Sequence, residues 1–163
     1  GGLRYASRVG ALTGTISCVK NAEISEAADY PIEAVTGAEA IMGSTRMKAG
    51  TAQKLILNMI STSVMIKLGK VYKNYMVDVK PTNKKLVVRS KNMIRTLTGV
   101  DEDRAEQLYE ASGHNVKKAL VMEIMDVDKE TAEGALNEVS AMLNLINGDG
   151  HIKRAIQYLG GDV

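Results

Sequence analysis

The residues best suited to bind a ligand stand in one run, GSTRMKAGTAQK, from Gly43 to Lys54. Ser44 and Thr45 offer hydroxyl groups, and Arg46 and Lys48 place two cations where a long helix is predicted to begin. The first turn of a helix has unpaired N–H groups and a partial positive charge, so each cation there costs roughly 0.3–1 kcal/mol. A phosphate or carboxylate docked on this turn would offset that cost, with Arg46 binding it through two parallel hydrogen bonds.

A plainer interpretation of the same run stays open. Arg46 and Lys48 would point into solvent, and Ser44 would be an ordinary helix cap. No Glu or Gln follows Ser44 by three residues to complete a capping box. Thr51 stands one helical turn further on, and Glu39, the nearest carboxylate, is interpreted as a positioning or structural residue.

Other residue types give little sign of chemistry. Cys18 is the single cysteine, ends an apolar run and is expected to be a structural thiol. Together with the two histidines it makes no metal-ligand set, so we expect no metal site. His114 and His151 begin two similar segments; a catalytic pair is conceivable, but residues at helix starts usually cap the helix or face solvent.

The first half of the chain has the element order of a parallel βαβ fold. The pattern predicts helix 3–10, strand 11–18, a short helix at 21–28 capped by Asn21, strand 31–36 and helix 45–68, which ends at Gly69. Two strands are few for a parallel sheet, so we expect more of the sheet upstream of Gly1. The helix at 45–68 is apolar on nearly every face, which predicts burial in a core or a subunit interface.

After a mixed segment at 71–79, the pattern becomes purely helical. Helices are predicted at 82–97, 102–112, 115–125, 129–143 and 150–159, with Asp101 and Asp128 as caps. The segments that begin at Gly113 and Gly150 resemble each other, which suggests a repeated helix hairpin. We expect a compact bundle of three or four helices.

The composition narrows the class of partner. The 163 residues carry 21 basic and 19 acidic side chains, and this balance disfavours a nucleic-acid-binding surface. The lone cysteine fits a reducing compartment, and we find neither a signal peptide nor a membrane span. The expected location is the cytoplasm.

The Gly43–Lys54 run resembles the signature segment of N-acetylmuramic acid 6-phosphate etherases, which have a sugar isomerase (SIS) domain. Flanking segments resemble this family too, and the similarity extends over essentially the whole chain. These segments are ISC at 16–18, LNMIST at 57–62, GKVY at 69–72, MVDV at 76–79 and NVKKA at 115–119.

The resemblance implies an α/β fold in which residues 1–80 are the C-terminal portion of a SIS domain. Residues 81–163 would form an all-α module similar to a ubiquitin-associated (UBA) bundle. Family members cleave the lactyl ether of their substrate, giving N-acetylglucosamine 6-phosphate and D-lactate in cell-wall recycling. The resemblance therefore also implies a reaction that uses two carboxyl groups and neither a metal nor an organic cofactor. The two catalytic glutamates of the family lie upstream of the matching region, so no catalytic residue is expected in this chain, and the chain alone should be inactive.

The resemblance further implies that Ser44, Thr45, Arg46, Lys48 and Thr51 line the sugar-phosphate pocket with Glu39 nearby, and that the protein is a homodimer. Two other functions stay open. One is a non-catalytic sugar-phosphate sensor similar to glucokinase regulatory protein, which also has SIS domains. The other is an interaction module built on the helices at 100–140.

Overall fold

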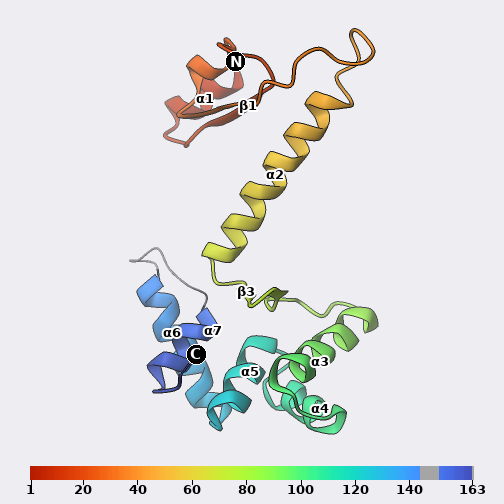
Figure 1. Ribbon diagram of the computed structural model, residues 1–163. Helices are drawn as coiled ribbons and strands as arrows, with labels where there is room; N and C mark the ends of the chain where they lie inside the picture. Colours follow the sequence, from red (N-terminus) through yellow and green to blue (C-terminus); the bar gives the residue numbers. More distant parts are fainter. Residues whose placement is uncertain (144–150, 163) are drawn as a thin grey trace. The chain divides into compact units, whose positions relative to one another are not determined.

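A computed structural model describes residues 1–143 and 151–162 of the chain, which divides into two compact units, residues 1–62 and 63–163 (Figure 1). The elements, in chain order, are α1 (Gly2–Arg8), β1 (Gly14–Ser17), the 3-10 turn η1 (Ser25–Ala27), β2 (Tyr30–Glu33), α2 (Lys48–Lys67), β3 (Val71–Tyr72), β4 (Tyr75–Met76), α3 (Lys84–Thr98), α4 (Glu102–Ala111), α5 (Val116–Met125), α6 (Lys129–Leu143) and α7 (His151–Tyr158). The helix predicted at 150–159 has its first residue outside the described residues.

A small parallel sheet forms the centre of the 1–62 unit. β1 pairs with β2 from Gly14 opposite Tyr30 to Ser17 opposite Glu33, so both strands are shorter than predicted. Just before the sheet, the carboxylate of Asp29 accepts hydrogen bonds from the amide and the hydroxyl of Thr13, each at 2.8 Å. These bonds hold the pKa of Asp29 below its ordinary value.

Of the one or two helical turns predicted at 21–28, only the three-residue 3-10 turn η1 forms. Asn21 has a left-handed backbone (φ 52°) and does not cap the turn. Instead, the Glu33 carboxylate accepts bonds from the amides of Asn21 and Ala22 at 3.0 Å and from the Ser25 hydroxyl at 2.7 Å. These bonds lower the pKa of Glu33, and they use amides that a longer helix would have needed for its own cap.

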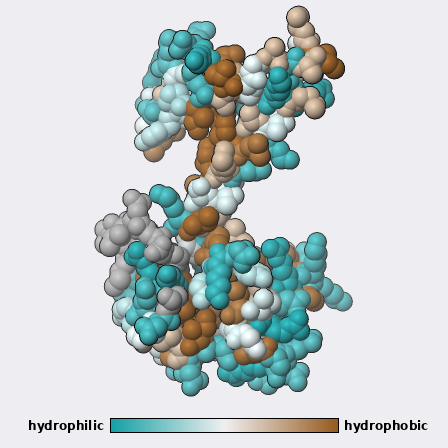
Figure 2. All heavy atoms as spheres, in the orientation of Figure 1, coloured by the Kyte–Doolittle hydropathy of each residue, from teal (hydrophilic) through white to brown (hydrophobic). Residues whose placement is uncertain are grey.

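Helix α2 begins at Lys48, three residues later than predicted, and its C-terminus is followed by Gly69 with a left-handed φ of 62°. No residue of α2 is buried among the described residues, so its burial in a core or a subunit interface stays a prediction. Leu57 and Met59 are about three-fifths exposed (57% and 61%). Apolar side chains gather along α2 in Figure 2.

The 63–163 unit contains the hydrophobic core of the described residues. The segment at 71–79 forms the antiparallel hairpin β3–β4, and α3, α4 and α5 pack against one another. Helices α6 and α7 pack against α5 and against each other. The described part of this unit thus contains the five helices predicted along the chain, in a bundle larger than the expected three or four. The largest fully buried apolar side chains are Tyr109, Ile94, Leu120, Ile152, Ile156, Val77, Val116 and Val121.

The predicted caps of this unit are confirmed. Asp101 accepts a bond from the Arg104 amide at 2.8 Å and caps α4. Asp128 accepts a bond from the Thr131 amide at 2.8 Å. The hydrogen bonds from the side chain and the amide of Thr131 lower the pKa of Asp128.

Taken by its elements, the chain is mostly helical, with a small parallel sheet followed by a helical domain. Among the described residues, no helix has the length and apolar character to cross a membrane.

Candidate functional site

The run from Gly43 to Met47 forms a tight turn immediately before α2. Gly43 has a φ of 81°, a left-handed conformation that favours glycine, and the Ser44 amide donates to the carbonyl of Ile41 at 3.1 Å. At the other end, the Gly50 amide donates to the carbonyl of Thr45 at 3.0 Å. A Cβ on residue 50 would lie 3.3 Å from that carbonyl oxygen, so a side chain there would require the turn to shift by a few tenths of an ångström.

The anion at the start of α2 is the carboxylate of Glu39. It accepts hydrogen bonds from the amide of Lys48 at 3.0 Å and from the amide of Ala49 at 3.0 Å. These two bonds, with a smaller contribution from the charge of Lys48, hold the pKa of Glu39 below its ordinary value. The Lys48 ammonium donates to the carbonyl of Ala38 at 2.6 Å. Glu39 and Lys48 thus lie together, with Glu39 in the position that the sequence suggested for a ligand anion.

The other predicted site residues border the same turn without partners. Within residues 1–143 and 151–162, the side chains of Ser44, Thr45 and Arg46 make no hydrogen bond or ion pair. Thr45 and Arg46 are exposed, and Ser44 is half-buried. Thr51 is exposed on the first turn of α2. Two hydroxyl groups and a guanidinium are therefore available to a ligand at this turn.

The start of α2 is tied to the end of β1. The side-chain amide of Gln53 donates to the carbonyl of Ile16 at 3.2 Å, and the Cys18 thiol lies 3.7 Å from the carbonyl oxygen of Ala49. The turn therefore lies beside the carboxyl end of a parallel strand, where open α/β sheets bind ligands. Sequence reasoning missed Gln53, because its polar side chain gave no sign of a partner in a strand 37 residues away.

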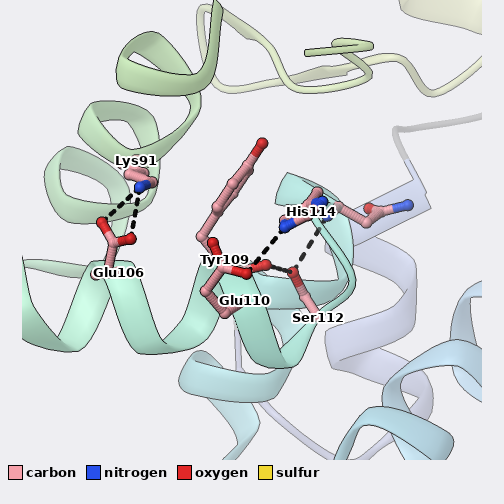
Figure 3. Close-up of polar contacts among 7 residues, drawn as sticks. Lys91, Glu106, Tyr109, Glu110, Ser112 and His114 are labelled. Carbon is pink, nitrogen blue, oxygen red and sulfur yellow. Dashed lines mark hydrogen bonds and ion pairs between the residues drawn. The ribbon is translucent and has the colours of Figure 1, made fainter. Parts of the chain in front are cut away.

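His114 belongs to a polar cluster at the end of α4 (Figure 3). Its ring stacks on Tyr109 with 4.8 Å between centroids, and its Nε2 lies 2.9 Å from a carboxylate oxygen of Glu110. The backbone of His114 is left-handed, with φ of 63°, which places it in the turn between α4 and α5. These contacts support a structural role for His114. The side chain of His151, the other half of the conceivable catalytic pair, lies outside the described residues.

Tyr109 is the buried centre of this cluster. Burial raises the pKa of its hydroxyl, and the Lys91 ammonium lies 5.4 Å from its ring centroid (Figure 3). Lys91 also donates to Glu106 at 2.6 Å, and this bond raises the pKa of Lys91. The cluster joins α3 to α4 and holds the turn that leads into α5. Across the described residues, no group of three or more His, Cys, Asp or Glu side chains could hold a metal ion.

Comparison with known proteins shows which proteins this chain is similar to. The chain is 56% identical over 157 residues to an N-acetylmuramic acid 6-phosphate etherase of Clostridium botulinum, covering 96% of this chain and 49% of that protein. This chain is a close homologue of such etherases. A protein of the same name from an Exiguobacterium species is 54% identical over 143 residues, which cover 88% of this chain and 49% of the relative. A third, from Francisella tularensis subsp. novicida, is 58% identical over 132 residues, covering 81% and 45%.

The chain spans about half the length of these etherases, and the match is to their C-terminal portion. Residues 73–147 also match the family described as the C-terminal lid domain of glucokinase regulatory protein. That match begins in the turn between β3 and β4 and covers β4 and the helices α3 to α6. The resemblance to etherases inferred from the Gly43–Lys54 run and its flanking segments is confirmed by the etherase relatives.

Proposed function

We propose that the protein containing this chain is an N-acetylmuramic acid 6-phosphate etherase, a carbon–oxygen lyase that produces N-acetylglucosamine 6-phosphate and D-lactate. The observation that carries the proposal is the 56% identity to a protein of that name over 96% of this chain. Residues 1–80 would complete a SIS-type α/β domain, and residues 81–163 would be its helical module.

The turn before α2 is the proposed contact with the substrate phosphate. The free hydroxyl groups of Ser44 and Thr45 and the guanidinium of Arg46 supply donors for a phosphate dianion. Lys48 adds a charge on the same turn. We assign Glu39 a positioning role, because its carboxylate already binds the amides of Lys48 and Ala49 and repels a second anion from them.

This assignment changes how the anion would be bound. Because the first amides of α2 are occupied, the phosphate would be held mainly by side chains of the turn. The proposed contacts are therefore Ser44, Thr45, Arg46 and Lys48, with Thr51 one turn further along the helix. The catalytic acid and base are expected upstream of Gly1, and the chemistry requires two carboxyl groups and no cofactor.

The experiment that tests the activity is an assay of D-lactate release from N-acetylmuramic acid 6-phosphate. We expect the whole protein to release lactate and the 163-residue chain to release none. Lactate release by the chain alone would overturn the proposal that the catalytic carboxyl groups lie upstream.

A second function is favoured by the match of residues 73–147 to a domain of a regulatory protein. In that case, the whole protein would bind sugar phosphates without cleaving them. The same assay separates the two functions, because a sensor would bind the substrate in a titration and release no lactate.

A further inference from the structure

A pocket of about 290 Å³ opens in the 63–163 unit. The start of α5 and the middle of α6 line it, together with residues on both sides of the β3–β4 hairpin. Five charged side chains face it, namely Lys70, Asp78, Lys117, Lys118 and Glu133. No residue of the turn before α2 belongs to this pocket, so the proposed etherase site does not account for it.

Three lysines and two carboxylates line the pocket, and their ion pairs differ in distance. Lys118 lies 3.1 Å from Glu133, and Lys70 forms a close ion pair with Asp78. The Lys117 ammonium lies 3.9 Å from the same Asp78 oxygen that binds Lys70. Two ammonium groups therefore share one carboxylate oxygen of Asp78, and among the described residues that line the pocket three cations face two anions.

Lys117 is the most enclosed of these cations, with only 13% of its side chain exposed. Burial lowers its pKa, the carboxylate of Asp78 opposes this change, and the charge of Lys70 adds to it. The surroundings thus disfavour the charged form of Lys117 more than its partner stabilises it. An additional anion would correct this imbalance.

The backbone at the start of α5 also favours an anion in the pocket. Asn115 caps α5 by accepting a bond from the Lys118 amide at 3.1 Å. The amides that precede it, those of Val116 and Lys117, lie before the first intrahelical hydrogen bond. The first turn of α5 contains no acidic residue, in contrast to α4, where Glu102 and Asp103 complement the helix dipole.

We propose that this pocket binds a small dianionic ligand of the phosphate monoester class. Lys117 would be the principal cation, with Lys70 and Lys118 beside it. The side chains of Asn137 and Ser140, which also line the pocket, would bind hydroxyl groups of the esterified alcohol. The site is distinct from the proposed substrate turn and would let the helical domain sense a phosphorylated metabolite.

The test is a titration of the 163-residue chain with inorganic phosphate and then with glycerol 3-phosphate, followed by amide and lysine side-chain NMR. Glycerol serves as the neutral control. We expect saturable shifts at residues 115–118, a rise in the pKa of Lys117 on binding, and no response to glycerol. Shifts confined to residues 43–49, or none at saturating phosphate, would overturn the proposal.

Variants separate this pocket from other cationic surfaces. Lys117→Gln should weaken binding of glycerol 3-phosphate about tenfold or more, because it removes a charge-assisted hydrogen bond. Lys85→Gln, which changes an exposed lysine of α3, should leave this affinity unchanged. Equal affinity in wild type and Lys117→Gln would contradict the proposal.

Lys118→Gln provides a second measurement if Lys117→Gln fails to fold. It should also weaken binding, since it removes a cation from the same turn. The alternative is that Lys117 only attaches the hairpin to α5. In that case its substitution lowers the stability of the chain, and neither wild type nor any variant binds the phosphate ester. That result would show the proposal to be wrong. The proposed etherase function is tested separately by the lactate-release assay on the whole protein, because these titrations measure binding and no turnover.

Discussion

At the residue scale, Glu39 has the clearest individual role in the 1–62 unit. Its carboxylate binds the amides of Lys48 and Ala49, and these bonds lower its pKa. A carboxylate whose pKa is lower in the folded state stabilises that state at pH values above its unfolded pKa. The contribution is lost as the pH falls through the folded pKa. Glu39 therefore links the acid stability of this unit to the geometry of the proposed phosphate turn.

We predict that Glu39→Gln destabilises the chain at pH 7 and that the difference from wild type shrinks as the pH falls below the ordinary pKa of Glu39, 4.5. The neutral amide of Gln binds the two N–H groups less strongly than a carboxylate does. Urea unfolding at pH 7 and near pH 3 measures this difference. Glu26→Gln, at an exposed carboxylate of η1, is the control and should have little effect at either pH.

Two glycines of the helical unit test how tightly its residues pack. Gly134 lies in α6 with no atom within 4 Å of a Cβ placed on it. A Cβ on Gly161 would lie 2.6 Å from the sulfur of Met125 and 2.8 Å from Cγ2 of Ile156. The end of the chain thus packs closely against α5 and α7.

We predict opposite effects for alanine at these two positions. Gly134→Ala should raise the free energy of unfolding by about 0.5–1 kcal/mol, because alanine favours the helix and restricts the unfolded chain. Gly161→Ala should lower it by about 1–3 kcal/mol, because the added methyl group displaces packed side chains. Thermal unfolding of both variants measures this. A neutral Gly161→Ala would mean that Met125 moves aside freely.

At the scale of elements, the helical unit was easier to predict than the sheet. Asp101 and Asp128 were recognised as caps because each bonds an amide only three residues further along. Glu39 bonds amides nine and ten residues away, and Glu33 bonds amides eleven and twelve residues before it. No local pattern reveals such bonds. They accompany the late start of α2 and the single short turn in the segment 21–28.

At the candidate site, too, the local features could be predicted from the sequence and the long-range contacts could not. The residue types and spacing of the Gly43–Lys54 run were sufficient to recognise the family and to place an anion at the start of α2. That the anion in this structure is the chain's own Glu39 depends on the path of the loop from 39 to 47, which sequence periodicity does not describe. The pocket beside Lys117 was also not predicted, since its charges come from three separate segments.

At the scale of the whole molecule, α2 carries a long run of exposed apolar side chains. Its exposed apolar side chains include Leu55, Leu57, Met59, Ile60, Val64 and Ile66. Monomeric proteins rarely expose extended apolar patches. We therefore propose that α2 lies at the interface of a homodimer.

We predict that the chain associates in a concentration-dependent manner and that Leu57→Lys weakens this association, because it places a charge on the apolar face of α2. Sedimentation velocity measures the effect. Val88→Lys is a matched control, since Val88 on α3 is as exposed as Leu57, at 57%. Wild-type chain that remains monomeric at every concentration would contradict a role for α2 in association.

The central claim is that the turn before α2 binds the phosphate of the substrate. Its most direct test is the affinity of the whole protein for N-acetylmuramic acid 6-phosphate after Arg46→Ala, with Arg8→Ala, at an exposed arginine of α1, as the control. We predict that Arg46→Ala weakens binding tenfold or more, corresponding to roughly 1.5–3 kcal/mol for a charge-assisted hydrogen bond, while Arg8→Ala has no effect. Unchanged affinity in Arg46→Ala would place the guanidinium outside the substrate site and contradict the account.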